Sequence, residues 1–152
     1  MSFASQTIPT TSNATPIQSY TPEPQSPNFG GQINVVTTIT NFAGTNQTLT
    51  AAQILGGFII GIPTGAANYT TDTAANIINA IEGAVVGSTI KVTIRNKSAG
   101  ANTITLVAGT GVTLNSGDTV TVVQNAQKTF KFIVTGLGAS AAVTVYSDAL
   151  TF

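Results

Sequence analysis

Carboxylates are the strongest candidates for acid–base or metal chemistry in this sequence, because the chain contains no histidine and no cysteine. A pair of carboxylates can catalyse glycoside hydrolysis only if both face one site. The chain has five carboxylates, and they are expected on a tail, a helix cap, a helix end, a turn and the C-terminus: Glu23, Asp72, Glu82, Asp118 and Asp148. Histidine, the commonest general base and metal ligand, is missing. We therefore expect no enzyme, no catalytic residue and no cofactor.

Two short stretches offer weaker candidates for a ligand site. In LNSGD, Asn115, Ser116 and Asp118 provide oxygen atoms of the kind that bind calcium, but a single carboxylate is a weak ligand set for this ion. The same letters are typical of a hairpin turn. Gly109-Thr110-Gly111 is similar to part of a phosphate loop, yet the Gly-Lys-Ser/Thr that should follow is absent. We predict a turn at each place and no metal site.

The charged residues are few and unevenly placed. They make up 7% of the chain and sum to zero, so little repulsion keeps copies apart, which favours a protein that works in an assembly. All five cations come late: Lys91, Arg95, Lys97, Lys128 and Lys131. If their strands pair, Lys128 and Lys131 lie near Lys91 and Arg95 and make a small basic patch for an acidic partner, although lysines on strands more often guard an exposed edge. The patch is too sparse to predict nucleic-acid binding.

The second half of the chain determines the expected fold class. From Ser88 to Ser147, apolar residues alternate with polar ones, which places each set on one face of a strand. Turn-forming stretches separate the runs (SAGAN, GTG, NSGD, NAQ and TGLGAS). About five short antiparallel strands at this spacing indicate a sandwich or barrel. We predict a mainly β domain of antiparallel, jelly-roll-like type.

The first half adds strands and two short helices. We expect a strand over Gln32–Thr40, a loop over 41–46 and a loop over Thr64–Thr71. Thr50 and Gln53 match a capping box, and Gly56-Gly57 should end the helix that it opens. The run from Phe58 to Ile62 indicates a buried strand that stops at Pro63. We detect no internal repeat.

The second helix begins near Asp72. Thr71 or Asp72 is its expected cap, and apolar residues recur with helical spacing at Ala74, Ile77, Ile78 and Ile81. Gly83 should end it. Together the two helices would form a lid over the β-structure rather than a separate domain.

Residues 1–31 differ from residues 32–152, which we expect to form a single β-rich domain. Five of the six prolines lie in residues 1–31, among serine, threonine and glutamine, as in an extended arm. Spaced apolar residues are candidate docking anchors on this arm: Phe3, Ile8, Ile17, Tyr20 and Phe29. The segment lacks the pattern of a signal peptide, and no run approaches the roughly 20 apolar residues of a membrane helix. We expect no membrane partner.

Four phrases carry a family resemblance: LTAAQILGGFIIGIP, DTAANIINAI, GAVVGSTIKVTIRNKSAGANTITLVAGTGVTL and AVTVYS. Over residues 49–147, about two-thirds of the chain, the sequence resembles small capsid decoration proteins (head-fibre or cement-like) of tailed bacteriophages and related viruses. The resemblance implies a virion protein that forms homotrimers on the outer capsid surface, with the major capsid protein as partner. Attachment through the N-terminal region is also implied.

Composition and the resemblance together assign provisional roles to two parts of the chain. We expect the arm to dock on the capsid, and Phe58, Ile60 and Ile62 to contribute to the oligomer interface. The competing interpretation is a fibre or tail adhesin that binds host-surface glycans. Such sites usually stack an aromatic ring on sugar, and here tryptophan is absent, leaving Tyr69, Tyr146 and a few phenylalanines.

Overall fold

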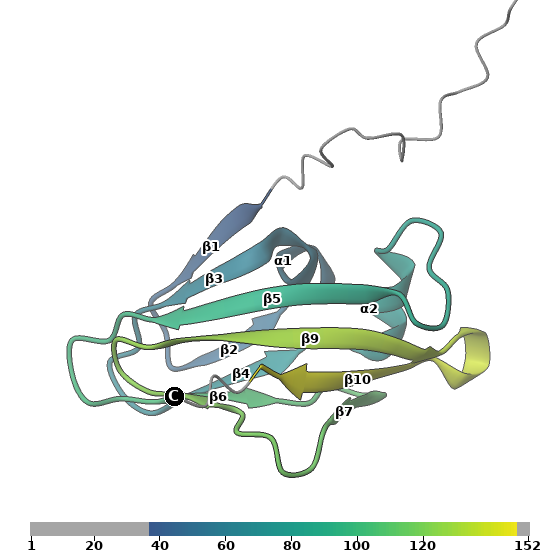
Figure 1. The fold of residues 1–152 in the computed structure, drawn as a ribbon. Coiled ribbons are helices and arrows are strands. Elements are labelled where there is room, and N and C mark those ends of the chain that lie inside the picture. Colours follow the sequence, from purple (N-terminus) through teal and green to yellow (C-terminus); the bar gives the residue numbers. More distant parts are fainter. Residues whose placement is uncertain (1–36, 149–152) are drawn as a thin grey trace, which may run out of the picture. The chain divides into compact units, whose positions relative to one another are not determined.

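The computed structural model describes residues 37–148, and these fold mainly as β-strands in two sheets (Figure 1). The six-stranded sheet contains, in spatial order, β1 (Thr38–Phe42), β3 (Gly57–Gly61), β5 (Thr89–Asn96), β9 (Gln127–Gly136), β10 (Ala142–Ser147) and β7 (Val112–Leu114). The four-stranded sheet contains β2 (Asn46–Leu49), β4 (Ala67–Thr71), β6 (Ile104–Val107) and β8 (Thr121–Val122). The helices are α1 (Ala51–Gly56), α2 (Ala74–Asn79) and the short 3-10 turn η1 (Gly138–Ser140). The prediction of a mainly β fold is confirmed.

The direction of the strands departs from the prediction. β1, β3 and β5 pair in parallel, as do β2, β4 and β6, and β7 is parallel to β10. Among the strands of residues 37–148, only the pairs β5–β9, β9–β10 and β6–β8 are antiparallel. The expectation of antiparallel pairing was wrong for the pairs formed among the first six strands, because these strands alternate between the two sheets. Each strand therefore pairs with the next but one, which runs in the same direction.

This alternation creates a structural repeat that we did not detect in the sequence. Each of the first two units contains a strand of the six-stranded sheet, a strand of the other sheet and a short helix. In register, Asn46 pairs with Asn68 and Leu49 with Thr71, which aligns NQTLTAAQIL with NYTTDTAANII. The similarity is hard to see because it is short and Asp72 is an insertion in the second copy.

The two helices are held at their N-termini by matching threonines. Thr50 Oγ1 accepts a hydrogen bond from the Gln53 amide at 3.3 Å, and Gln53 Oε1 accepts one from the Thr50 amide at 2.9 Å. The predicted capping box is thus confirmed, and Gly57, at φ 80°, ends α1. At α2 the cap is Thr73, not Thr71 or Asp72, and the helix stops at Asn79, before Gly83.

The core lies between the sheets and includes residues from both helices. Inward residues of the six-stranded sheet are almost fully buried, among them Val92, Ile94, Phe130 and Phe132. Ile54 of α1 and Ile77 of α2 belong to the same apolar cluster, which agrees with helices that cover the β-structure.

Two predicted boundaries in the first half were wrong. β4 occupies part of the expected loop 64–71, and its one large apolar residue, Tyr69, is fully buried in edge contact with Phe42. The sequence Asn68-Tyr69-Thr70-Thr71 shows little alternation of apolar and polar residues, which explains why this strand was predicted to be a loop. The strand expected over Gln32–Thr40 is seen as β1, which begins at Thr38 and runs to Phe42; the positions before 37 lie outside the described residues.

Candidate functional site

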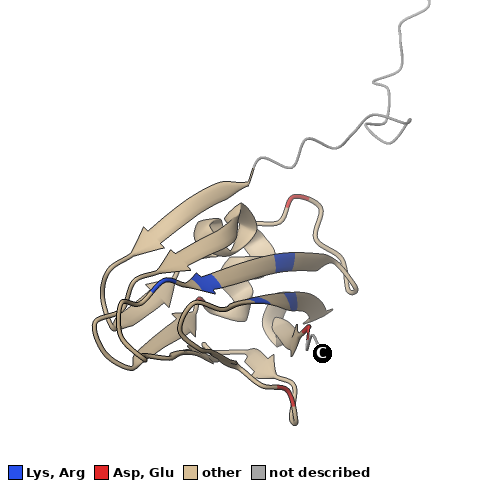
Figure 2. Cartoon of the chain, turned by 60° about the vertical axis from the view of Figure 1, so that its left-hand side comes forward, with Lys and Arg blue, Asp and Glu red and all other residues tan. Residues whose placement is uncertain are grey.

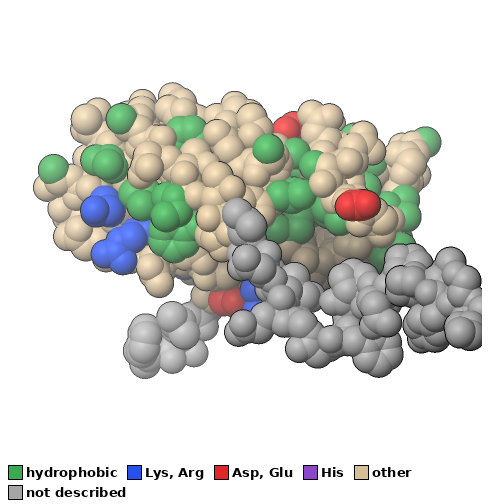
Figure 3. Space-filling view, turned by 90° about the horizontal axis from the view of Figure 1, so that it is seen from above, with side chains coloured by type: hydrophobic (Ala, Val, Ile, Leu, Met, Phe, Trp, Pro, Cys, Tyr) green, Lys and Arg blue, Asp and Glu red, His purple; other side chains and the backbone are tan. Residues whose placement is uncertain are grey.

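The outer face of the six-stranded sheet carries an unusual distribution of side chains. The outward residues of β3, and Ile62 just beyond it, are apolar, whereas on β1 Ile39 is apolar and Asn41 is polar. We call Ile39, Phe58, Ile60 and Ile62 the apolar strip. Ile39 lies beside Phe58 in register, and 58% of Ile39 and 44% of Ile62 is exposed. Figure 3 shows hydrophobic side chains beside Lys or Arg side chains on this side of the molecule.

The apolar strip includes the three residues expected at an oligomer interface. Their strand was predicted to be buried, but only Ile59 is, at 0% exposure, because alternation turns its neighbours outward. Phe58 and Ile60 are half-buried and Ile62 is exposed, so β3 is a strand with one buried face. The strand prediction is confirmed and its complete burial was wrong.

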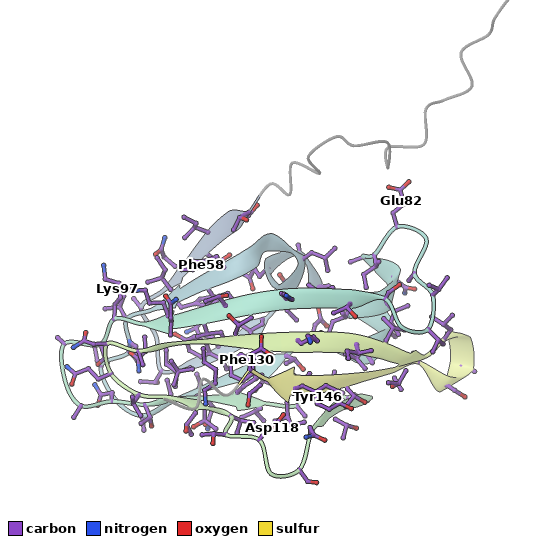
Figure 4. The ribbon with its side chains drawn as sticks, viewed as in Figure 1. Phe58, Glu82, Lys97, Asp118, Phe130 and Tyr146 are labelled. Atoms are coloured by element: carbon purple, nitrogen blue, oxygen red, sulfur yellow. The ribbon has the colours of Figure 1, made fainter. Side chains whose placement is uncertain are left out.

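Next to the apolar strip, β5 and β9 carry most of the positive charge. We call Lys91, Arg95, Lys97 and Lys131 the basic strip, which is coloured blue in Figure 2. Ile60 lies beside Arg95, and Lys91 lies directly opposite Lys131. Lys97 is exposed just after the end of β5 (Figure 4). The expected approach of Lys91, Arg95 and Lys131 is therefore observed.

Lys128 does not belong to the basic strip. It lies opposite the inward residue Ile94, and its Nζ donates a hydrogen bond to the Thr119 carbonyl at 2.7 Å. Desolvation lowers the pKa of Lys128, and the nearby Asp118 carboxylate partly offsets that effect. The inclusion of Lys128 in a surface patch was wrong, because one residue of strand register separates it from the outward set.

Polar and aromatic residues, together with the half-buried Ile133, occupy the remainder of this outer face. The hydroxyls of Thr93 and Thr129 share a hydrogen bond of 2.8 Å across β5 and β9. Arg95 Nη1 donates to Gln127 Oε1 at 3.4 Å, a long bond on an exposed surface. Tyr146 lies beside Lys131 in register and is 40% exposed, whereas Tyr69 is buried. Only one of the two tyrosines considered for sugar stacking is therefore at the surface.

The four carboxylates within residues 37–148 come from turns and the ends of different elements: Asp72, Glu82, Asp118 and Asp148. Asp72 links the helices: its Oδ2 accepts from the Ala51 amide at 2.9 Å, and its Oδ1 accepts from the Thr73 amide and from Asn76 Nδ2. The hydrogen bond from Asn76 is the largest cause that holds the Asp72 pKa below its ordinary value. Glu82 follows α2, and Asp148 follows β10. The described part of the chain has no group of three or more metal-ligating side chains of the His, Cys, Asp or Glu type.

Both stretches considered as ligand sites are turns with structural contacts. Asp118 Oδ2 accepts a hydrogen bond from the Ser147 amide at 2.9 Å, which ties LNSGD to β10. Gly109 donates its amide to Thr71 Oγ1 at 2.8 Å, and the Ala74 amide donates to the Thr110 carbonyl. A Cβ on Gly109 would lie 2.3 Å from the Thr71 carbonyl oxygen, so the backbone at the end of β4 packs closely against this turn. The turn predictions are confirmed.

Sequence reasoning missed a buried polar network in the loop that follows β5. Asn96 Nδ2 donates to the carbonyls of Asn102 and Val122, and Asn96 Oδ1 accepts from the Ser98 amide. Ser98 Oγ donates to the Pro63 carbonyl at 2.8 Å. Both side chains are satisfied and almost fully buried, so the network fixes the loop and offers no free group for chemistry. The sequence signal that could have predicted this network is Asn96, a polar residue at the end of an alternating strand and just before the turn residues Ser98-Ala99-Gly100.

The expected docking anchors Phe3, Ile8, Ile17, Tyr20 and Phe29 lie outside the described residues. Within residues 37–148, no helix is long and apolar enough to cross a membrane. Comparison with protein-family models, characterised proteins and solved structures gives no match.

Proposed function

We propose that the chain is a structural subunit of a virus particle, a capsid decoration or cement protein on the outer surface of the shell. The observation that carries this proposal is the outer face of the six-stranded sheet, where apolar side chains are exposed on a folded body. Exposed apolar side chains that lie together typically mark a protein interface. The four phrases that resemble decoration proteins supply the particular class.

The fold supports an assembly role in this proposal. We infer that the two sheets pack as a β-sandwich, because each contributes buried residues to one shared core. The jelly-roll form of that sandwich is not part of the proposal, since β1, β3 and β5 run in parallel. Such a rigid body suits a subunit that projects from a shell, and the resemblance favours three copies in each assembly.

In this proposal the N-terminal arm attaches the body to the major capsid protein. Its apolar residues are too few to form a core, so pockets on a partner would bury them. Deletion of residues 1–28 should leave the body folded and oligomeric but abolish co-sedimentation with stripped capsids. Replacement of four anchors by serine should act similarly: Phe3, Ile8, Ile17 and Tyr20. Equal co-sedimentation of full-length chain and deletion variant would remove the arm from the mechanism.

Oligomerisation through the apolar strip has a separate test. Light scattering of the full-length chain should give a mass above that of one copy, and Phe58→Ser with Ile60→Ser should reduce it to a monomer. Val123→Ser is the matched control, because Val123 is 57% exposed and lies just beyond β8 in the other sheet. A monomeric wild-type chain across micromolar concentrations would refute this interface.

One observation favours a second candidate function, a fibre or tail adhesin that binds host glycans. Tyr146 is 40% exposed beside Lys131, and an exposed aromatic ring can stack on a sugar. A glycan array with the wild-type chain and Tyr146→Ala would distinguish the two. Glycan binding that depends on Tyr146, with few copies of the protein on each particle, would favour the adhesin.

A further inference from the structure

We propose that the basic strip is a second docking site, which binds a protein surface where carboxylates lie beside apolar side chains. This inference goes beyond attachment through the arm, and it rests on the proposed function in that the acidic surface belongs to the capsid. Four of the five cations of the chain contribute to the strip: Lys91, Arg95, Lys97 and Lys131. They are confined to two adjacent strands and the residue that follows β5 (Figure 2).

The arrangement of the strip is unfavourable for the isolated body. Lys91 and Lys131 are paired in register on the same face, and like charges directly opposite each other destabilise a sheet. On the far side of Lys131 the neighbour in register is Tyr146, not an acid. A carboxylate from a partner, placed between the two ammonium groups, would relieve this repulsion.

A second copy of the chain is poorly suited to fill this role. Asp72 and Asp118 accept hydrogen bonds from their own backbone, at the helix ends and in a turn. Asp148 follows β10 beside Thr129, at the margin of the same outer face, and Glu82 is isolated after α2. Since none of these forms an acidic surface, charge complementarity points to a different protein.

The neighbours of the cations also favour a protein over a polyanion. Tyr146 lies beside Lys131, and the half-buried Ile133 lies two positions further along β9 on the same face. A partner that covers this face therefore buries apolar and aromatic surface together with the charges, as the centre and rim of a protein interface do. Nucleic acid instead requires a clustered basic footprint that follows the phosphates.

The two docking sites differ in their response to salt. The arm contains one charged residue, Glu23, so its attachment should change little with ionic strength. Attachment through the basic strip should weaken as salt screens its charges. We expect full-length protein to lose about tenfold in affinity for stripped capsids between 50 and 500 mM NaCl, with the residual binding due to the arm.

The deciding variant is full-length Lys91→Gln with Lys131→Gln. It should bind stripped capsids about tenfold more weakly than wild type at low salt and lose most of its salt dependence. Ser116→Glu with Ser140→Glu is the matched control, since it changes the net charge equally at exposed turns away from the strip. Wild-type affinity and salt dependence in the glutamine variant would overturn the basic strip as a docking site and leave the proposed function intact. Wild-type protein that binds no capsids at any salt would overturn both.

Two further readouts do not depend on capsids. Lys131→Glu should raise the melting temperature by about 2 °C, because it replaces repulsion from Lys91 by attraction. A lowered melting temperature would contradict the claimed repulsion. Strip-dependent binding of a 20-nucleotide DNA duplex, tighter than binding to capsids, would assign the strip to a polyanion and overturn the proposal.

Discussion

The two faces of the six-stranded sheet are built from the same strands, yet they follow different rules. On the inner face, Val92, Ile94, Phe130 and Phe132 are at most 1% exposed. On the outer face, the alternating residues of β5 and β9 are lysine, arginine, threonine and glutamine, with Ile133 as the one apolar side chain, and most keep contact with solvent. Adjacent residues of one strand therefore differ in role: one is fixed by packing in the core, and the next is available to a partner.

This difference predicts where substitutions act. A residue of the inner face contributes chiefly to the stability of the body, because removing buried atoms leaves a cavity. A residue of the outer face contributes little to stability, since solvent already surrounds it, and its effect appears in binding or assembly. Substitutions on adjacent residues of one strand can therefore test the comparison directly.

The largest effect is expected from Phe132→Ala. Phe132 is 1% exposed in the core, and truncation of a buried phenylalanine costs about 3–5 kcal/mol of unfolding free energy. Chemical denaturation monitored by circular dichroism, at fixed protein concentration, measures the loss. A loss below about 1 kcal/mol would show that the core between the sheets is loosely packed at this strand.

Gly61→Ala tests how tightly the inner face is packed. A Cβ at Gly61 would lie 2.4 Å from both Tyr69 Oη and Ile104 Cδ1, so the alanine must displace side chains of the facing sheet. Overpacking of this kind costs about 1–3 kcal/mol. Gly65→Ala is the control, because the nearest atom there, Thr45 Cγ2, is 3.6 Å away. Equal melting temperatures for the two variants would contradict the close contact between the sheets.

The features of the fold that the sequence predicted correctly are those with a signal in neighbouring residues. The alternation in β5, β9 and β10 predicted both the strands and their inward residues correctly. A strand with one apolar and one polar face produces a pattern that repeats every two residues in the sequence. Thr50 and Gln53 gave the start of α1 because a capping box is a local hydrogen-bond pattern. Strand direction was missed, since parallel pairing joins residues about 20 positions or more apart and leaves no local mark.

The candidate site was predictable only in parts. Phe58, Ile60 and Ile62 were predicted to be interface residues from their apolarity, which remains a prediction, and their exposure depends on the register of β3 against β5. The opposition of Lys91 and Lys131 likewise required the pairing of β5 with β9, which the alternation left undetermined. Asp72 was assigned to a helix cap, whereas its bond to Ala51 comes from the stacking of the two repeat units.

Asp72→Asn compares the strip of exposed charges with a charged side chain of a different kind. The Asp72 carboxylate accepts hydrogen bonds from backbone amides, whereas the lysines of the basic strip face solvent. Both carboxylate oxygens accept hydrogen bonds, so an amide would direct its NH2 group at one of the donors. We expect a loss of about 1–2 kcal/mol at pH 7, as for other helix-end side chains. Denaturation at fixed protein concentration measures this loss.

The pH dependence of Asp72 gives a second measurement. Because its pKa in the folded state is below 3.8, the stabilisation is present above that value and is lost as the pH falls through the folded pKa. The difference in stability between wild type and Asp72→Asn should therefore shrink under acid conditions. A difference that stays constant from pH 7 to pH 2 would contradict this assignment.

Tyr69→Phe, on the core side of β4, should stabilise the body, unlike the changes to the inner face of the six-stranded sheet. The Tyr69 hydroxyl is buried without a hydrogen-bond partner among residues 37–148, and its removal should gain about 1 kcal/mol. Burial also raises the Tyr69 pKa from 10.0 to about 12. The folded state therefore keeps this proton longer than the unfolded state, and stability that is full below pH 10 falls as the pH rises to about 12. Melting curves should show a smaller alkaline loss for the phenylalanine variant, and a less stable variant at pH 7 would indicate a partner for the hydroxyl.

The smallest effect is expected from Lys131→Ala, one residue before Phe132. Lys131 points outward, opposite Lys91, so truncation removes a repulsion as well as some contact of its aliphatic chain. These terms have opposite signs, and the change in unfolding free energy should stay within about 0.5 kcal/mol. Thermal melts of Lys131→Ala and Phe132→Ala at equal concentration compare the two faces of β9 directly. If the alanine at 131 were the more damaging of the two, the register of β9 would be shifted by one residue, and the apolar and basic strips would belong to the core.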